Sequence, residues 1–306
     1  MASPFHPDFK HARFLPRTLV PAYAIPLWNA GLAVQAALTR DGHVAARGAT
    51  GQEIWLYRPE GAKGPRPALL WIHGGGTVCG HPVSEAKIAA ELSRTRGLVV
   101  ALPRYRLAGK APYPAALDDV FAALEWLAAH PEVDPARIAV GGDSAGGGLA
   151  ACLAIAARDR GGPPVAYQVL HEPMLDEGTR RRPAPDPKGL RIWSSKANTR
   201  AWGLYLRGVE GDVPGTASAA RAPDLTGLPP AFLGVGTADL FHDETLAYAR
   251  RLRESGVECT LDVVPGGFHG FALAPRAPVA RAYRARMQGA LARGLGLETP
   301  PQTGDV

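Results

Sequence analysis

The most constraining feature of this chain is a serine in a glycine-rich turn between an apolar run and an Ala/Leu-rich helical pattern. The run RIAVGGDSAGGGLA places Ser144 after a segment typical of a buried strand and before one typical of a helix. Gly142 and Gly146 fit a turn too sharp for side chains. The pattern predicts that the Ser144 hydroxyl stands above a sheet at a helix N-terminus, where the helix dipole favours a developing anion. A structural turn with Ser144 as a helix cap is the alternative.

The same alternation of strand and helix patterns extends through the middle of the chain. Several apolar runs are continuous, as expected of strands that are covered on both faces. The predicted strands are Glu53–Tyr57, Ala68–Ile72, Leu98–Leu102, Arg137–Val140, Val165–Leu170, Ala231–Val235 and Cys259–Val264. The predicted helices are Ser84–Thr95, Pro114–Ala129, Ser144–Arg158, Glu244–Ser255 and Pro278–Arg293. This order predicts an α/β fold with a mostly parallel central sheet flanked by helices.

Two regions depart from the alternation. We expect an α/β core formed by residues 46–178 and 229–300, an N-terminal cap segment formed by residues 1–45, and a cap insertion formed by residues 179–228. The insertion is rich in Pro, Arg and Trp and offers one helix, around Arg191–Leu206. A long loop in a compact α/β domain is usually functional, and open α/β sheets bind ligands at the carboxyl ends of their strands. These regions therefore predict a small helical cap over that edge.

A second glycine-rich loop follows a predicted strand at His73-Gly-Gly-Gly. Backbone amides in such a loop can point at a substrate oxygen, so Gly75 and Gly76, with the amide of Ala145, are expected to form an oxyanion hole. A phosphate-binding loop would require a Lys-Ser/Thr pair or a GxGxxG pattern at a helix start, and neither is present. His73 and Asp143 are expected to support these loops. A proton-carrying His73 is the alternative.

Three histidines follow Ser144 in the chain: His171, His242 and His269. His269 lies in a glycine-rich loop directly after the last predicted strand, at the edge where the other loops gather, and is therefore the predicted base. Asp239 follows the preceding strand and is the predicted acid, which would hold His269 in one tautomer and stabilise it once protonated. Asp243, in the first turn of a helix whose dipole alone favours carboxylates, remains the alternative acid.

Composition excludes several classes of protein. The net charge is +6, but the arginines are scattered, and the densest cluster, Arg180–Arg182, lies among prolines. This distribution favours a solvated surface over a patch that binds nucleic acid or a membrane. Cys79, Cys152 and Cys259 lack CxxC spacing and metal-ligand histidines at zinc-like intervals, so they predict no disulfide framework and are compatible with a reducing compartment.

The segment Leu19–Thr39 is uncharged and follows Lys10, Arg13 and Arg17, a pattern similar to a signal peptide or a short membrane span. Interruptions by proline, asparagine, glycine and glutamine favour instead an apolar helix that lies over an active site. We expect a cytoplasmic protein without stable membrane insertion. Export or membrane association through residues 19–39 is the alternative.

Seven motifs in order resemble the bacterial hormone-sensitive-lipase family of esterases, a branch of the α/β hydrolases. They are HGGG at 73–76, YRLA at 105–108, YPAALDD at 113–119, GDSAGG at 142–147, PMLD at 173–176, DLFHDE at 239–244 and HGF at 269–271. The resemblance implies an α/β-hydrolase fold with a cap and a Ser144–Asp239–His269 triad. It also implies hydrolysis of small-molecule esters with short to medium acyl chains through an acyl-enzyme, without a cofactor or metal.

The sequence departs from the family pattern at three places. Gly109-Lys110 follows YRLA, Thr77-Val78-Cys79 follows HGGG where an aromatic residue is usual, and Glu172 precedes PMLD where an aromatic residue is common. Alternatives that remain open are amide, carbamate or lactone hydrolysis, an interfacial lipase, and a non-catalytic hydrolase-like binding protein. The last predicted strand could also pair across a homodimer.

Overall fold

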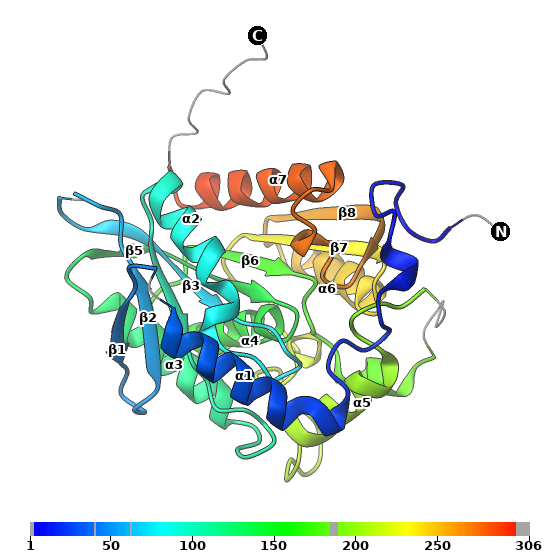
Figure 1. Ribbon diagram of the computed structural model, residues 1–306. Coiled ribbons are helices and arrows are strands. Elements are labelled where there is room, and N and C mark those ends of the chain that lie inside the picture. The colour runs from blue at the N-terminus through cyan, green and yellow to red at the C-terminus, as the bar shows by residue number, and fades with distance from the viewer. Residues whose placement is uncertain (1–2, 40, 62, 184–188, 298–306) are drawn as a thin grey trace.

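The computed structural model describes residues 3–39, 41–61, 63–183 and 189–297. Its centre is an eight-stranded sheet with the order β1-β2-β4-β3-β5-β6-β7-β8 (Figure 1). The strands are β1 (Val44–Arg47), β2 (Glu53–Tyr57), β3 (Arg66–Ile72), β4 (Val99–Pro103), β5 (Val133–Asp143), β6 (Tyr167–His171), β7 (Ala231–Ala238) and β8 (Cys259–Phe268). β2 pairs antiparallel with both β1 and β4, and all neighbouring pairs from β4 to β8 are parallel. The predicted mostly parallel α/β sheet is thus confirmed.

Helices cover both faces of the sheet. They are α1 (Ile25–Leu38), α2 (Ala86–Arg96), α3 (Ala115–Ala128), α4 (Ala145–Arg160), α5 (Ser195–Tyr205), α6 (His242–Glu254) and α7 (Pro278–Gly294). Leu70 and Ile72 of β3 belong to the core cluster that contains α3, α4 and α6, whereas Leu69 and Trp71 belong to the cluster that contains α2 and α7. Because alternate side chains face two covered sides, the strand sequences are continuously apolar.

Every predicted strand and helix has an observed counterpart, but several boundaries differ. β5 extends to Asp143 because its glycines pair with the end of β3, at Trp71↔Gly141 and Ile72↔Gly142. Ser84 lies in a 3₁₀ helix, and α2 begins only at Ala86. β1 was not predicted. It is a four-residue edge strand with largely exposed side chains, so it lacks the apolar run that marks a buried strand.

The two regions outside the predicted core meet each other. Leu19 N donates to Ile192 O (2.8 Å), Ile192 N donates to Pro16 O (2.8 Å), and the hydroxyls of Thr18 and Ser194 lie 2.6 Å apart. These contacts bring α1 and α5 to one end of the molecule (Figure 1). The division into a core and a cap stays a prediction. Some residues of the predicted core and cap segments lie outside the described residues, namely 1–2, 40, 62, 184–188 and 298–300.

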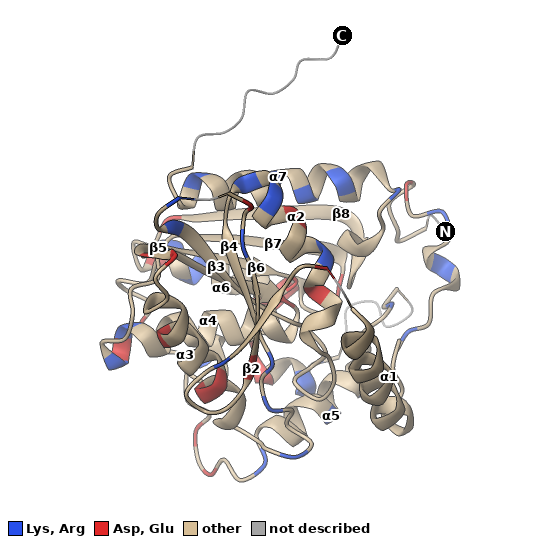
Figure 2. Ribbon diagram, turned by 60° about the vertical axis from the view of Figure 1, so that its left-hand side comes forward, with Lys and Arg blue, Asp and Glu red and all other residues tan. Residues whose placement is uncertain are grey.

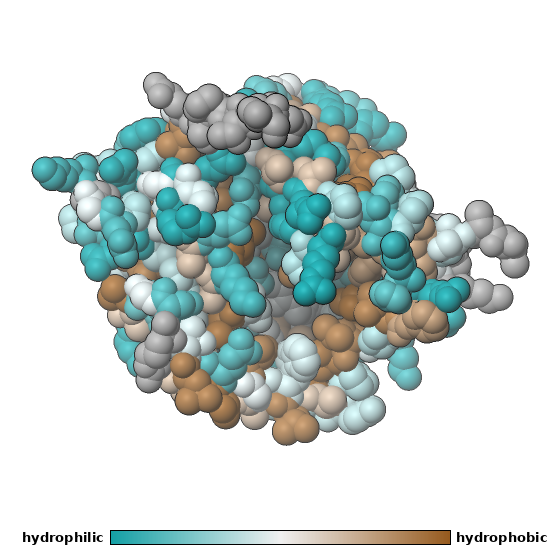
Figure 3. All heavy atoms as spheres, turned by 45° about the horizontal axis from the view of Figure 1, so that its top comes forward, coloured by the Kyte–Doolittle hydropathy of each residue, from teal (hydrophilic) through white to brown (hydrophobic). Residues whose placement is uncertain are grey.

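The predicted apolar helix in the N-terminal region is α1. It carries no charged residue (Figure 2), and Leu27, Val34 and Leu38 are exposed on it. Hydrophobic residues gather toward the lower margin of the face shown in Figure 3, whereas hydrophilic ones dominate its upper part. None of the helices in the described ranges combines the length and apolarity needed to cross a membrane.

Cationic residues are distributed over several elements, including α7 and the loops (Figure 2). That no nucleic acid binds stays a prediction, supported by this dispersion. β8 forms an edge of the sheet, and the homodimer suggested for this strand also stays a prediction.

Candidate active site

Ser144 lies at a sharp strand-to-helix turn between β5 and α4. Its backbone has φ 55° and ψ −117°, outside the regions that most L-residues adopt, and it forms the N-cap of α4. The turn needs glycine on both sides: a Cβ at Gly142 would lie 2.3 Å from Ile72 O, and a Cβ at Gly146 would lie 2.0 Å from the same oxygen. The close approach of β3 therefore holds the turn and presents the Ser144 side chain at the end of the sheet.

The side chains of Ser144, His269 and Asp239 form a continuous hydrogen-bonded chain. His269 Nε2 lies 3.0 Å from Ser144 Oγ, and His269 Nδ1 lies 2.8 Å from Asp239 Oδ2. All three residues are buried. They follow the ends of three different strands, β5, β8 and β7, which places them at one edge of the sheet.

The Asp239 carboxylate is held in place by its own loop. Its second oxygen, Oδ1, accepts a hydrogen bond from the backbone amide of Phe241 (2.9 Å). Asp243, the alternative acid, has a side chain that is 66% exposed and contacts His242 instead. The geometry therefore joins His269 to Asp239.

The other two downstream histidines lie outside this chain. His242 is paired with Asp243 at the start of α6, whereas His171 is buried at the end of β6 with its Nδ1 2.7 Å from Tyr283 Oη. Burial lowers the pKa of His171 to about 3, so this imidazole is neutral at physiological pH.

The glycine-rich loop after β3 leaves backbone donors free near Ser144. Among the described residues, no oxygen accepts a hydrogen bond from the amides of Gly75, Gly76 or Ala145. Gly74 and Gly75 line the same cavity as Ser144, and Ala145 begins the helix behind it. An oxyanion hole requires backbone amides of this kind, and the assignment of Gly75, Gly76 and Ala145 to one stays a prediction.

His73 lies at the start of this loop and is buried. Its Nδ1 lies 2.8 Å from Gly74 O, and its ring stacks on Tyr105 at 4.2 Å between centroids. Tyr105 Oη in turn donates to His73 O (3.1 Å), which links YRLA to HGGG. Burial lowers the pKa of His73 to about 3, so the ring is neutral and suits a supporting role better than proton transfer.

Two buried carboxyls of the family-like motifs hold loops together away from Ser144. Asp119 accepts hydrogen bonds from the Arg106 guanidinium at 2.9 Å, which joins YPAALDD to YRLA. Glu244 accepts from the amide of Leu175 (2.7 Å) and from the Thr179 hydroxyl, which joins DLFHDE to PMLD. The motifs thus pack as one framework around the site.

A cavity of about 840 Å³ opens in front of Ser144. Two segments line it together: residues 18–23, 25 and 28 of the N-terminal region, and residues 192–194, 196–197 and 199–200 before and within α5. The Trp193 ring centroid lies 6.3 Å from that of His269. A cavity of this size with largely apolar walls and a few converging polar groups is typical of a small-molecule site.

Sequence reasoning missed a carboxyl pair in this cavity. Glu85 and Asp143 both line it, and Glu85 Oε2 accepts a hydrogen bond from Trp71 Nε1 (3.1 Å). Burial, followed by the neighbouring Glu85 charge, raises the pKa of Asp143 well above its usual range. The predicted loop support by Asp143 stays a prediction, and its partner Glu85, on a 3₁₀ helix, carries no local signal in the sequence.

One cluster of side chains could hold a metal ion by its donor atoms. It consists of Glu172, Asp239 and His269, each of which offers one donor atom within 4.8 Å of the others, and no other such cluster is found among the described residues. An imidazole with two carboxylates is a donor set that suits zinc. Here His269 Nδ1 already bonds to Asp239 and Nε2 faces Ser144. The donors are thus arranged for transfer of a proton between side chains.

Comparisons with known proteins agree with this geometry. A family model described as the α/β-hydrolase fold matches residues 69–273. The carboxylesterase NlhH of Mycobacterium tuberculosis is 35% identical over 237 residues, which cover 73% of this chain and 72% of the relative. An ethyl acetate hydrolase of Pseudomonas putida is 34% identical over 249 residues, with coverage of 76% and 73%.

A solved structure of a bacterial heroin esterase aligns with a TM-score of 0.85 at 36% identity, over 95% of this chain and 98% of that one. The crystal structure of esterase LipW from Mycobacterium marinum gives 0.83 at 31% identity, over 95% and 96%. The family match spans most of the chain, from β3 to the loop after β8. The protein therefore belongs to the α/β-hydrolase family, in its hormone-sensitive-lipase-like branch of esterases.

Proposed function

We propose that this protein is a serine carboxylic-ester hydrolase that acts on small-molecule esters with short to medium acyl chains through an acyl-enzyme. Ser144 is the nucleophile, His269 the general base and Asp239 the acid that orients it. The observation that carries the proposal is the chain of hydrogen bonds from Asp239 through His269 to Ser144, at 2.8 and 3.0 Å, in which Ser144 and His269 line the cavity.

In the first half of the reaction, Ser144 Oγ attacks the ester carbonyl carbon while His269 Nε2 takes the hydroxyl proton. The carbonyl oxygen becomes an anion and accepts hydrogen bonds from the amides of Gly75, Gly76 and Ala145. The positive charge on the imidazole is stabilised by Asp239, which is buried beside it. The tetrahedral intermediate then breaks its bond to the alkoxy oxygen, and His269 protonates the leaving alcohol.

The second half uses the same groups on water. His269 Nε2 takes a proton from a water molecule, whose oxygen attacks the acyl carbon bound to Ser144. The intermediate collapses with cleavage of the bond to Ser144 Oγ, and His269 returns the proton to that oxygen. The carboxylic acid leaves, and no cofactor is required for any step.

The substrate class rests on the cavity and on the relatives. The aromatic and aliphatic walls suit an apolar acyl or alcohol group, and the volume of about 840 Å³ accommodates small esters. Two of the relatives are named as a carboxylesterase and as an ethyl acetate hydrolase.

We also propose that the protein is cytoplasmic. The three free cysteines support this location, because disulfides are rare in a reducing compartment.

The decisive substitution is Ser144→Ala, assayed with p-nitrophenyl acetate. We expect turnover to fall by about 10³-fold or more, because no other group can form the acyl-enzyme. Circular dichroism and the midpoint of thermal unfolding should match the parent protein. Parental rates from pure Ser144→Ala protein would refute the proposal.

Rates with p-nitrophenyl esters of increasing acyl length, below and above their solubility limits, separate an esterase from an interfacial lipase. A matched amide and lactone panel tests the other substrate classes.

A further inference from the structure

Glu172 occupies a strained position directly after β6. Its φ is 44°, in the left-handed region that non-glycine residues rarely adopt because the conformation is strained. The backbone is held there because Glu172 N donates to Gly234 O of β7 (2.7 Å). The side chain is buried and lines the cavity. A strained, buried, ionisable residue beside Ser144 requires an explanation that the reaction steps above do not supply.

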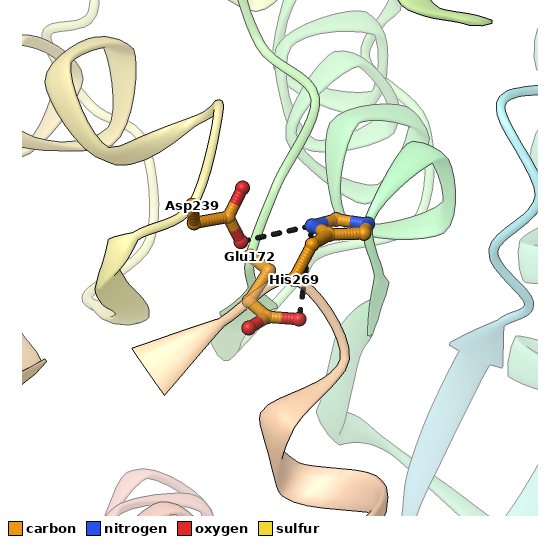
Figure 4. A group of neighbouring side chains, drawn as sticks. All are labelled: Glu172, Asp239 and His269. Atoms are coloured by element: carbon orange, nitrogen blue, oxygen red, sulfur yellow. Dashed lines mark hydrogen bonds and ion pairs between the residues drawn. The ribbon is translucent and has the colours of Figure 1, made fainter. Parts of the chain in front are cut away.

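The Glu172 carboxyl contacts the loop that carries His269. Its Oε2 accepts a hydrogen bond from the amide of Gly270 (2.5 Å) and lies 3.8 Å from His269 Nδ1. Figure 4 shows that Glu172 and Asp239 approach the same imidazole from different elements. The carboxyl thus fixes the residue that follows the base, while Asp239 fixes the base itself.

The surroundings of the other oxygen of Glu172 bear on its protonation state. Oε1 is buried and receives no hydrogen bond from any donor of the described residues. The carboxyl groups of Glu172 and Asp239 are neighbours, because an oxygen of each lies within 4.8 Å of the other and of His269. Two ionised carboxylates have no proton between them, so a hydrogen bond from one to the other requires that one is protonated. A proton on Glu172 lets its hydroxyl donate to the Asp239 carboxylate, in addition to the contacts that Asp239 makes with Phe241 N and His269 Nδ1.

The surrounding charges favour the same state. The titratable groups that face Glu172 come from five elements or their ends, and they are Asp143, His171, Asp239, His269 and Tyr283. Burial, followed by the charge of Asp239, raises the pKa of Glu172 well above its ordinary value. His171 supplies no counter-charge, because its own pKa is lowered to about 3.

Chemistry gives a reason for this arrangement. A second ionised carboxylate in this buried place would repel Asp239, the carboxylate that orients His269. A neutral Glu172 leaves one negative charge beside His269. It still supplies an acceptor for Gly270 and a donor for Asp239.

We propose that Glu172 is a positioning residue of the reaction, a proton-bearing carboxyl that donates to Asp239 and accepts from Gly270, and so holds the acid and the loop of the base in their working geometry. This inference rests on the proposed function and adds a fourth side chain to the three that carry it. Glu172 stands at the position before PMLD that departs from the family pattern.

The test compares Glu172→Gln with Glu172→Ala. Glutamine reproduces a neutral carboxyl, with an oxygen for Gly270 and an amide donor for Asp239, so kcat should stay within about threefold of the parent value. Alanine releases the His269 loop, and kcat should fall by about a hundredfold while KM changes little, because misplacement of a catalytic group by about 1 Å costs that much.

The pH profile provides a readout that a merely structural residue would not move. When Glu172 ionises, it loses its donor and repels Asp239, so kcat of the parent should fall on the alkaline side. Glu172→Gln has no proton to lose there and should lack that fall. Rates are corrected for spontaneous ester hydrolysis.

Glu244→Ala is the matched control, since Glu244 is a buried carboxyl that accepts backbone amides away from His269. It should lower the midpoint of thermal unfolding while kcat of the folded enzyme stays within about threefold. Three results would each overturn the inference. They are a parental kcat in Glu172→Ala, an equal loss of kcat in both Glu172 variants, and a kcat of Glu172→Gln that still falls on the alkaline side as in the parent. If Glu172→Ala does not fold, the Glu172→Gln profile decides alone. Activity in Ser144→Ala would instead refute the proposed function itself.

Discussion

Replacement of Asp239 by asparagine tests the acid of the proposed triad most sharply. The substitution preserves side-chain shape but removes the negative charge 2.8 Å from His269 Nδ1. Both side chains are nearly excluded from solvent, at 8% exposure for His269 and 0% for Asp239. Solvent therefore screens this pair weakly, and asparagine also favours the wrong imidazole tautomer.

The expected magnitude follows from the electrostatics. Unit charges about 4 Å apart attract by about 4 kcal/mol at an effective dielectric constant of about 20. This attraction acts only after His269 has taken the Ser144 proton, so its loss raises the barrier rather than weakening substrate binding. Since about 1.36 kcal/mol corresponds to a tenfold change in rate, kcat should fall by about 10³-fold with KM nearly unchanged.

The assay is steady-state hydrolysis of p-nitrophenyl acetate by Asp239→Asn and by Asp243→Asn. Asp243 is the matched control, because its side chain is 66% exposed and hydrogen-bonds to His242 rather than to His269. The control should keep kcat within about twofold. A kcat above about a tenth of the parent value in Asp239→Asn, or a larger loss in Asp243→Asn, would refute the assignment.

Three further predictions concern stability and metal dependence. Burial lowers the pKa of His73 to about 3, so as the pH falls the unfolded chain takes up a proton on this imidazole before the folded protein does. The stability that the neutral, buried ring contributes is therefore complete above pH 6.5 and is lost as the pH drops toward 3. His73→Gln should flatten the acid side of the curve of unfolding free energy against pH, by at most about 1.4 kcal/mol per pH unit, in urea titrations. Gly146→Ala places a Cβ 2.0 Å from Ile72 O and should destabilise the protein by about 2 kcal/mol or more in urea unfolding; a change below about 0.5 kcal/mol contradicts the described turn. Treatment with EDTA should leave ester hydrolysis unchanged, and a loss restored by zinc would show instead that Glu172, Asp239 and His269 hold a metal.

Features encoded in short stretches of sequence were predictable. The turn at Ser144 depends on neighbouring glycines, and strands such as β6 are continuously apolar because both faces are covered. The approach of His269 to Ser144 was also predictable, since loops at the carboxyl ends of parallel strands meet at one edge. The distances from His269 to Ser144 and Asp239 could not be predicted, because they depend on how β7 and β8 pack.

Features that depend on distant contacts were not predictable. Nothing near Leu19 indicates its hydrogen bond to Ile192, although that bond helps to form the cavity walls. Glu172 stood out only as a departure from a motif, and its contact with Gly270 joins residues 98 positions apart. β1 was missed because an exposed four-residue edge strand needs no apolar run.

Mass spectrometry of the protein after reaction with a fluorophosphonate ester tests the central claim most directly, because the reagent marks only a serine that is activated as a nucleophile. We expect one adduct per chain, on the peptide that contains Ser144, with loss of esterase activity in proportion to labelling. Ser144→Ala should remain unlabelled. An adduct on a different residue, or full activity in protein labelled completely at Ser144, would contradict the account.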